Sequence, residues 1–354
     1  MVGIKLNSEK IPLEESLAEL DSLARTAGAA PVAVLTQARP KPDQKYFIGT
    51  GKVDELRALC GAQDADLIIF DHEVSPSQIR NLEEALGIKV IDRTELILDI
   101  FAQHARTREG VLQVELAQAE FTLSRLTGRY RMLSRLGGGI GTRGPGETKL
   151  EMDRRLIRKN ISLLKKKLEE VRKNRRLLRE KRKSSQILTG TLIGYTNAGK
   201  STLLNALSRS KIQTANQLFT TLDPVTRRIY LPEGKVVLLT DTVGFIQKLP
   251  HQLIDAFRAT LEEVTEADFL VHVVDSSARY VEDQMTVVFN LLGELEAANK
   301  PTLTVFNKID KLESPKQIEK LLKKYQPAVC VSALNQTSWD DWFKALAQLP
   351  WPPP

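Results

Sequence analysis

The 354-residue sequence contains only two cysteines, Cys60 and Cys330, and no Cys-x-x-Cys pair. This excludes a disulfide-stapled scaffold and a cysteine zinc site, and it suits a reducing compartment. None of the four histidines forms a ligand pair at helical spacing, which argues against a histidine metal site. No apolar run approaches the roughly 18 residues that a membrane-spanning helix needs, and the start has no signal-peptide core. We therefore expect a soluble, cytoplasmic protein without membrane-spanning segments.

Positive charge is concentrated in one stretch. The formal net charge is +7, from 51 Lys and Arg against 44 Asp and Glu. Between Arg154 and Lys183, 15 Lys and Arg stand against only 3 Glu, so this stretch alone carries +12. The remainder of the chain is mildly acidic. A hydrophobic content of 42% is typical of a folded protein, and the length suffices for two or three domains.

Residues 1–107 alternate short apolar runs with helical patterns. The runs at 32–35, 67–70 and 89–92 predict strands of a small parallel α/β sheet. The sequence Ser-Pro-Ser-Gln at 75–78 offers an N-cap serine, a proline at the first helical position and a capping-box glutamine. It therefore predicts the start of a helix.

Residues 108–185 carry apolar residues at steps of four and three on both sides of a glycine-rich stretch at 137–146. The two seams comprise Leu112, Leu116, Ala119, Leu123, Leu126, Tyr130 and Leu133, then Ile157, Ile161, Leu164, Leu168 and Val171. Two such helices joined by a loop are expected to fold back into an antiparallel hairpin. Its second arm would present a strongly positive face.

Residues 186–354 repeat a strand–helix pattern. The predicted strands lie at 191–194, 236–239, 269–274, 302–306 and 328–331. This series is typical of a doubly wound sheet, which binds ligands at the carboxyl ends of its strands.

A phosphate-binding motif follows the first of these strands. It comprises Gly194, Tyr195, Thr196, Asn197, Ala198, Gly199, Lys200 and Ser201, with Thr202 next in the helix that it opens. Glycines let several backbone N–H groups face phosphates, and the helix N-terminus adds positive potential. Lys200 is expected to reach the β- and γ-phosphates, and the Ser201 hydroxyl to hold Mg²⁺.

Two later segments complete the expected phosphate and metal site. Asp241, Thr242, Val243 and Gly244 follow a strand, where a carboxylate can lie in the second shell of Mg²⁺ and the Gly244 N–H can meet the γ-phosphate. The other segment comprises Phe219, Thr220, Thr221, Leu222 and Asp223. We favour Thr221 over Thr220 as the threonine that completes the Mg²⁺ shell while the γ-phosphate is present. Catalysis is assigned to Lys200, Thr221 and Gly244.

A third segment predicts which base is bound. Asn307, Lys308 and Asp310 follow the strand at 302–306. The Asp310 carboxylate can accept from guanine N1–H and the 2-amino group, whereas adenine offers neither donor there, so the site selects guanine. Ser332, Ala333 and Leu334 can direct a backbone N–H at guanine O6.

With these motifs the sequence resembles the HflX-type translational GTPases of the Obg–HflX group. The resemblance covers nearly the whole chain, and the run from Gly138 to Glu151 is its most specific part. It implies a GTPase that binds the large ribosomal subunit and its rRNA and, in bacteria, splits stalled or idle ribosomes under stress. Many members carry a further C-terminal domain, and we expect this chain, a monomer, to stop before it.

Phe245 stands where many GTPases have a glutamine that orients the attacking water. A phenylalanine cannot hydrogen-bond to water, although it can simply pack the segment. We expect slow GTP hydrolysis by the protein alone and stimulation by the ribosome.

The basic arm is expected to contact nucleic acid, because it has too few Glu to form the ion pairs of an ordinary exposed helix. The residues assigned to RNA are Arg143, Lys165, Lys166, Lys167, Arg172, Lys173, Arg175, Arg176 and Arg179. Few aromatic residues lie among them, so contacts should be mainly with phosphates.

A weaker glycine motif, with Gly49, Gly51 and Lys52, lies in the first segment. It lacks the phosphate-loop spacing, so a plain turn before a helix is one interpretation and a second nucleotide site, for ATP, is another. The alternatives to a ribosome-associated GTPase are thus a nucleotide-gated RNA-binding module with incidental hydrolysis and an ATP-using RNA-remodelling factor.

Overall fold

The structure is a computed structural model that describes residues 1–6, 12–136, 145–183, 187–208, 218–219, 222–248, 258–312 and 316–349. The chain forms two compact units, here called the N-terminal unit and the C-terminal unit. The N-terminal unit holds residues 1–103 and 111–170, and the C-terminal unit holds 104–110, 171–249 and 257–354. Among the described residues, no helix is both long and apolar enough to cross a membrane.

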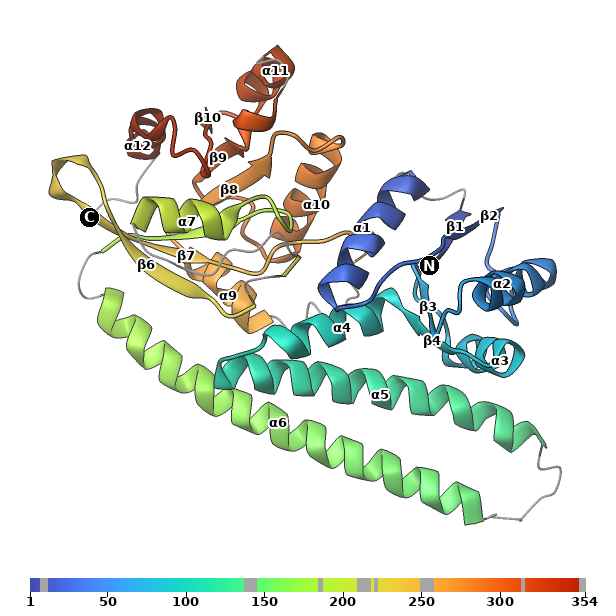
Figure 1. Ribbon diagram of the computed structural model, residues 1–354. Coiled ribbons are helices and arrows are strands. Elements are labelled where there is room, and N and C mark those ends of the chain that lie inside the picture. The colour runs from blue at the N-terminus through green and yellow to red at the C-terminus, as the bar shows by residue number, and fades with distance from the viewer. Residues whose placement is uncertain are drawn as a thin grey trace. The chain divides into compact units, whose positions relative to one another are not determined.

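The N-terminal unit contains a four-stranded parallel sheet in the order β2-β1-β3-β4 (Figure 1). Its strands are β1 (Val2–Leu6), β2 (Leu35–Arg39), β3 (Leu67–Phe70) and β4 (Lys89–Asp92). Its helices are α1 (Leu13–Thr26), α2 (Thr50–Ala62), α3 (Pro76–Leu86) and α4 (Arg93–His104). The predicted parallel α/β sheet is confirmed.

Local sequence explains how these elements form. Helix α3 begins at the predicted capping box: the Gln78 N–H donates to Ser75 Oγ at 3.4 Å, and the Ser75 N–H donates to Gln78 Oε1 at 3.0 Å. Apolar residues of α2 and α3 such as Leu56 and Leu82 pack on one face of the sheet with Ile68 of β3. Helix α1 packs on the opposite face. A Cβ on Gly3 of β1 would lie 2.9 Å from side-chain atoms of Leu13 and Leu17 of this helix, so the close approach needs glycine.

Two strand assignments in this unit differ from the prediction. The strand expected at 32–35 is wrong, since β2 begins only at Leu35 and both Val32 (56% exposed) and Val34 (50%) face outward. Strand β1 was not foreseen. Strand β2 lies at the edge of the sheet, so it carries polar residues that the search for apolar runs passes over.

The predicted hairpin consists of α5 (Arg108–Leu136) and α6 (Pro145–Lys183). Along α5, Glu109 and then Glu120 form ion pairs with Arg175 and then Lys165 of α6, so the two helices run antiparallel. Helix α6 already begins at Pro145, inside the stretch expected to be a loop, and residues 137–144 lie outside the described part of the chain.

The C-terminal unit contains a six-stranded sheet in the order β10-β9-β8-β5-β7-β6. Its strands are β5 (Thr189–Ile193), β6 (Val225–Tyr230), β7 (Val236–Asp241), β8 (Phe269–Asp275), β9 (Thr302–Asn307) and β10 (Ala328–Cys330). The five predicted strands are confirmed, and they are parallel. Edge strand β6 was not foreseen, and it makes the sheet mixed because it runs antiparallel to β7.

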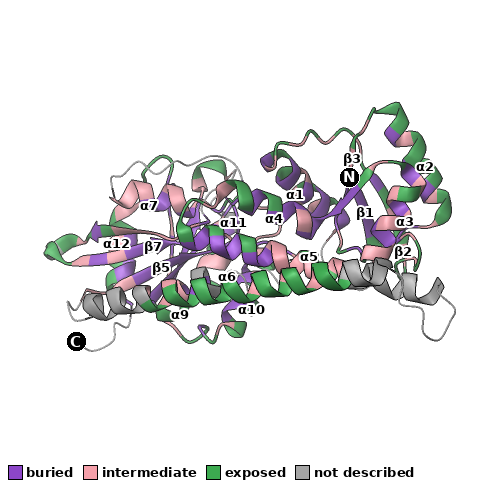
Figure 2. Ribbon diagram, turned by 90° about the horizontal axis from the view of Figure 1, so that it is seen from below, coloured by how far each residue is buried: buried purple, intermediate pink, exposed green. Residues whose placement is uncertain are grey.

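Helices cover both faces of this sheet. They are α7 (Lys200–Ser208), α9 (Arg258–Glu266), α10 (Val281–Glu294), α11 (Lys316–Lys324) and α12 (Trp339–Ala347), with 3-10 turns at Pro232–Gly234 and Ile309–Lys311. Helices α7 and α12 enclose the main core, and α10 and α11 enclose a second core around Phe306. Figure 2 shows the strands β5 and β7 in the purple of buried residues.

Candidate nucleotide-binding site

The predicted phosphate loop connects β5 to α7 at the carboxyl edge of the sheet, and two glycines fix its path. Gly194 (φ 147°) and Gly199 (φ 94°) adopt conformations that other residues rarely take. A Cβ on Gly194 would lie 2.1 Å from the Val273 carbonyl oxygen, and one on Gly199 would lie 2.2 Å from Asn307 Nδ2. The loop therefore needs glycine at both positions to pass close to its neighbours.

Lys200 lies buried at the start of α7 and is 6% exposed. Its ammonium group donates to the carbonyl oxygens of Gly194 at 3.1 Å and Tyr195 at 2.9 Å. Burial lowers the pKa of Lys200 to about 8, although the nearby Asp241 carboxylate opposes that shift. The loop thus fixes the position of the Lys200 amino group. A bound phosphate would stabilise its charged ammonium form.

Ser201 and Asp241 bring a hydroxyl and a carboxylate together beside the loop. The Ser201 hydroxyl donates to Asp241 Oδ2 at 2.5 Å, and Asp241, the last residue of β7, is fully buried. Oxygen ligands of this kind fit Mg²⁺. In the part of the chain that the structure describes, no group of three or more His, Cys, Asp or Glu side chains could hold a metal ion.

The segment after Asp241 lies directly on the phosphate loop. The Thr196 N–H donates to the Phe245 carbonyl at 2.7 Å, and the Phe245 N–H donates to the Gly194 carbonyl at 3.0 Å. The Gln247 N–H donates to the Tyr195 hydroxyl at 2.9 Å, a contact that the sequence did not indicate. Phe245 is only 3% exposed, so its ring packs inside the unit.

Asn307 connects the three loops of the expected base site. Its Nδ2 donates to the Ala198 carbonyl at 2.9 Å, and its Oδ1 accepts from the Ala333 N–H at 3.0 Å. The Asp310 carboxylate accepts a hydrogen bond from the Ser332 hydroxyl. The structure thus brings together the predicted residues of the phosphate loop, β9 and the loop after β10.

Lys308 has a partner that the sequence interpretation missed. Its ammonium group donates to the Asn197 carbonyl and to Asp275 Oδ2, both at 2.6 Å. Asp275 is the carboxylate that ends the buried strand β8. A carboxylate directly after a predicted strand was the signal that could have identified it.

The remaining predicted residues take varied positions. Phe219 and Leu222 are buried, Val243 is 7% exposed, and Leu334 is 73% exposed. Thr242 donates its hydroxyl to the Leu192 carbonyl at 2.8 Å, and Thr202 lies in α7. Asp223 is engaged with the segment before α5. Thr220 and Thr221 lie outside the described residues.

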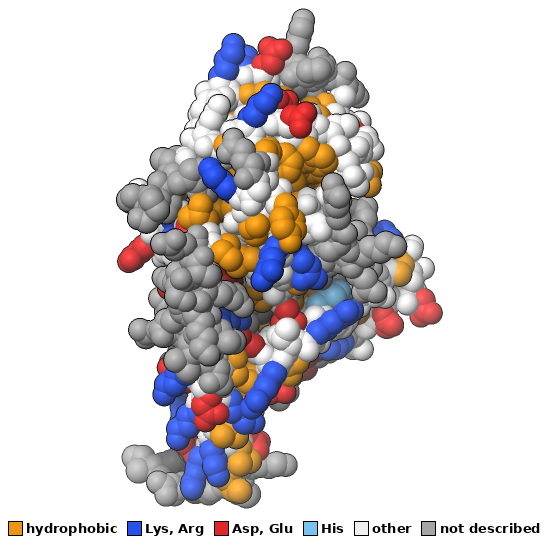
Figure 3. All heavy atoms as spheres, turned by 90° about the vertical axis from the view of Figure 1, so that its left-hand side faces the viewer, with side chains coloured by type: hydrophobic (Ala, Val, Ile, Leu, Met, Phe, Trp, Pro, Cys, Tyr) orange, Lys and Arg blue, Asp and Glu red, His pale blue; other side chains and the backbone are white. Residues whose placement is uncertain are grey.

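Three of the residues predicted to bind RNA form ion pairs within the chain. Lys165 pairs with Glu120, Arg172 with Glu262, and Arg175 with Glu109 and Glu263. Lys166, Lys167 and Lys173 are exposed. Arg143 lies outside the described residues, and the side chains of Arg176 and Arg179 are not described either. Lys and Arg side chains gather in the lower part of Figure 3, where the hairpin lies.

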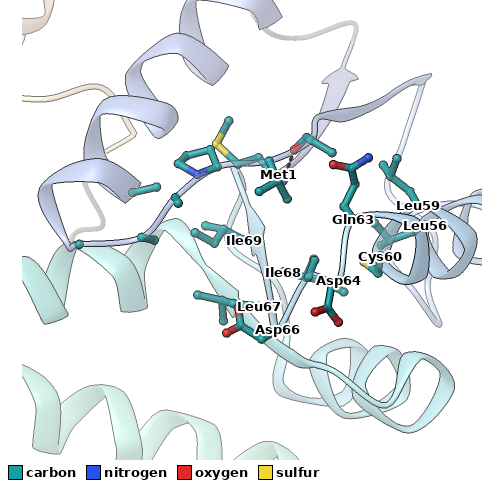
Figure 4. Close-up of a pocket in the computed structure, with 18 residues that line it drawn as sticks. Met1, Leu56, Leu59, Cys60, Gln63, Asp64, Asp66, Leu67, Ile68 and Ile69 are labelled. Atoms are coloured by element: carbon teal, nitrogen blue, oxygen red, sulfur yellow. Dashed lines mark hydrogen bonds between the residues drawn. The ribbon is translucent and has the colours of Figure 1, made fainter.

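The weaker motif of the N-terminal unit lies at the start of α2. The Gly49 N–H donates to Gln37 Oε1 at 3.0 Å, and the Lys52 ammonium pairs with Glu55 of its own helix at 2.7 Å. A pocket of about 380 Å³ in this unit lies at the amino ends of the strands, lined among others by Met1, Cys60 and Leu67 (Figure 4). None of the three motif residues lines this pocket. The ATP site stays a prediction, which loss of ATP binding in Lys52→Ala with GTP binding intact would support.

These features define a P-loop GTPase fold. They are the phosphate loop that needs glycine at two positions, the buried Lys200, the Ser201–Asp241 pair and the loops joined by Asn307. Three family models match successive parts of the chain: "GTP-binding GTPase N-terminal" at 14–102, "GTP-binding GTPase Middle Region" at 104–182 and "50S ribosome-binding GTPase" at 189–308.

Curated relatives agree with these models. The GTPase HflX of Caldanaerobacter subterraneus is 54% identical over 300 residues, which is 85% of this chain and 70% of the relative. The GTPase HflX of Escherichia coli is 48% identical over 299 residues, covering 84% and 70%. The chain therefore belongs to the HflX family of GTPases. Among solved structures, a GTP-binding protein from Sulfolobus solfataricus in complex with GDP is 25% identical with a TM-score of 0.50, covering 98% of both chains.

Proposed function

We propose that this protein binds and hydrolyses GTP with Mg²⁺, and that its GTP-bound form docks on the large ribosomal subunit and splits stalled or idle ribosomes under stress. The observation that carries the proposal is the union, in one chain, of two features: a P-loop GTPase fold in which Asn307 joins the phosphate loop to the loop after β10, and a helical arm whose residues 154–183 carry a net charge of +12. Its membership in a 50S ribosome-binding GTPase family supports the partner. Such a protein works in the cytoplasm, where the ribosomes are.

Each part of the nucleotide-binding site has a role in this proposal. Lys200 contacts the β- and γ-phosphates, and the Gly244 N–H contacts the γ-phosphate. Ser201 and Thr221 hold Mg²⁺, with Asp241 in the second shell, and the metal neutralises charge on the phosphates. The base is held by Asn307, Asp310 and the loop Ser332, Ala333 and Leu334.

Phe245 determines the expected rate. Because its ring is buried and offers no hydrogen bond, it cannot orient the attacking water. Hydrolysis by the protein alone is then slow, and a group supplied or ordered by the ribosome completes the site. Single-turnover GTP cleavage measured with and without ribosomes tests this, and fast cleavage that ribosomes leave unchanged would contradict it.

The RNA-binding surface is centred on exposed lysines of α6. Because Lys165, Arg172 and Arg175 are engaged in ion pairs, the proposal rests on Lys166, Lys167 and Lys173. Exposed neighbours on the same helix are Arg155, Arg158 and Lys159. Each phosphate contact releases counterions, so binding to the large subunit should weaken steeply as salt rises.

A charge-matched pair of variants tests this surface. Replacing Lys166, Lys167 and Lys173 by Gln should weaken binding to the large subunit and make its salt dependence shallower by about three units of slope. The control replaces the exposed Lys320, Lys323 and Lys324 of α11 by Gln and should leave the binding and its salt dependence unchanged. Equal behaviour of the two variants would rule out α6 as the RNA-binding surface.

A second candidate function follows from Phe245: a nucleotide-gated RNA-binding module in which hydrolysis is incidental. Ribosome splitting with GTP and with a non-hydrolysable analogue separates the two. Equal splitting in a single round would assign the work to binding, with hydrolysis only recycling the protein. Splitting that requires GTP cleavage would assign it to hydrolysis.

A further inference from the structure

The carboxylate of Asp223 is bound to the segment that opens helix α5. It accepts hydrogen bonds from the backbone N–H groups of Arg106 at 3.0 Å and Thr107 at 2.8 Å, and a third from the Thr107 hydroxyl. Thr107 in turn caps α5, since its hydroxyl oxygen accepts from the Gly110 N–H at 3.0 Å. One carboxylate thus holds both the entry to the helix and its capping residue.

Gly110 makes this approach possible. A Cβ at position 110 would lie 2.3 Å from Asp223 Oδ1, far inside contact distance. Glycine is a poor helix former because it loses more backbone entropy than alanine. The first turn of α5 therefore carries an unfavourable residue where the Asp223 carboxylate needs the space.

The position of Asp223 in the chain links this contact to the nucleotide. Only Leu222 separates it from Thr221, so the Cα atoms of residues 221 and 223 cannot be more than about 7 Å apart. A metal ion that fixed Thr221 would therefore also restrict Asp223. On the other side, Val225 opens β6 and pairs with Asp241, the carboxylate beside Ser201. Residues 104–110 and 223 belong to the same compact unit.

A second contact joins the base of the hairpin to the chain that follows the Asp241–Gly244 segment. Arg175 of α6 pairs with Glu109 of α5 and, at 3.6 Å, with Glu263 of α9. Helix α9 is the first described helix after the Asp241–Gly244 segment. Two segments are expected to respond to the γ-phosphate. Asp223, at the end of one, contacts the base of the hairpin, and so does Glu263, which follows the other.

We propose that Asp223 is a latch through which the nucleotide state controls the base of the hairpin. The latch, defined as the hydrogen bonds from residues 106 and 107 to Asp223, differs in strength between the GDP and GTP forms because Thr221 is bound to the metal only in the latter. The inference rests on the nucleotide switch of the proposed function but needs no ribosome.

Amide hydrogen exchange at Arg106 and Thr107 tests the latch in the free full-length protein. In the wild type, exchange rates with GDP and with a non-hydrolysable GTP analogue should differ by about tenfold or more, the factor expected for one hydrogen bond to a charged group. Gly110→Ala should raise exchange in both forms and abolish the difference, although alanine favours the helix. Gly293→Ala, at a helical glycine of α10 with open space around it, is the matched control and should behave as the wild type.

The outcomes separate this proposal from the proposed function. Thr107→Val, which removes the hydroxyl donor while keeping the side-chain shape, should also diminish the difference, and it serves if Gly110→Ala does not fold. Displacement of a fluorescent nucleotide, measured in the same samples, shows whether both nucleotides are bound. Bound nucleotides with equal exchange, or full protection in Gly110→Ala, would overturn the latch alone. Absence of nucleotide binding by the wild type would overturn the proposed function and the latch that rests on it.

Discussion

Asp310→Asn should turn the base preference of this protein from guanine to xanthine. A carboxylate accepts two hydrogen bonds from the guanine edge, whereas the amide of asparagine offers one acceptor and one donor. Facing guanine, that donor would meet the 2-amino group. Facing xanthine, it would meet the 2-carbonyl oxygen and form a hydrogen bond.

The structure gives the size of the effect. Asn307 fixes the loop before Asp310 through hydrogen bonds of 2.9 and 3.0 Å, and the Ser332 hydroxyl donates to the Asp310 carboxylate. The base site is therefore arranged before the base binds. A hydrogen bond to a charged group contributes about 1.5–3 kcal/mol. Because Asp310 lies at the surface, the lower value applies to the lost bond with the 2-amino group. The unpaired contact between two donors that replaces it costs about as much again, so the total is about 3 kcal/mol, or roughly a hundredfold in affinity.

Competition of GDP and xanthosine diphosphate against a fluorescent guanine nucleotide measures this preference. The wild type should favour GDP, and Asp310→Asn should bind GDP about a hundredfold more weakly while gaining affinity for xanthosine diphosphate. Asp340→Asn, at an exposed carboxylate of α12, is the control and should keep the preference for GDP. An unchanged preference in Asp310→Asn would refute the assignment of Asp310 to the base.

Three further predictions follow from the buried charges. Since the pKa of Lys200 is about 8 and phosphates need the ammonium form, nucleotide affinity measured by calorimetry should fall about fivefold between pH 8 and 9, and a flat profile would contradict this role. Burial, assisted by the positive charge of Lys200, lowers the pKa of His272 to about 3, below the unfolded value of about 6.5. Protons then favour the unfolded chain below pH 6.5, so moving from pH 7 to pH 5 should destabilise the C-terminal unit by about 2 kcal/mol more in the wild type than in His272→Val. Urea unfolding followed by fluorescence of the buried Trp342 measures this, and equal losses in the two proteins would be inconsistent with it. Arg93→Leu should destabilise the N-terminal unit by about 3–5 kcal/mol in urea unfolding followed by circular dichroism, because it leaves the fully buried Asp71 without its guanidinium partner. Arg25→Gln, which removes an exposed pair with Asp21, should cost far less, and similar losses in both variants would contradict the reasoning.

The sequence predicted the elements whose pattern is local. Buried central strands such as β3 and β8 read as apolar runs, and the capping box gave the start of α3. Strands β2 and β6, which lie at sheet edges, escaped because an edge strand carries polar residues on its exposed side. Strand β1, at the beginning of the chain, is interrupted by Gly3 and Lys5.

Within the candidate site, motif spacing identified residues whose roles depend on neighbours in the chain. It could not identify contacts between remote segments, such as Tyr195 with Gln247 or Lys308 with Asp275. Nor could it show that Arg175, one of the residues predicted to bind RNA, connects α6 to Glu109 of α5 and Glu263 of α9. Charge along a helix predicts a basic arm, but only the fold shows which of its side chains have acidic partners.

Sedimentation of the purified protein with large ribosomal subunits, in the presence of GDP, GTP or a non-hydrolysable GTP analogue, tests the central claim most directly. The claim is that the nucleotide bound between Lys200 and Asp310 controls the binding of the basic hairpin to the ribosome. The account predicts that the analogue gives the largest bound fraction, at least about tenfold tighter than GDP, a coupling of about 1.4 kcal/mol. Equal binding with all three nucleotides would contradict it.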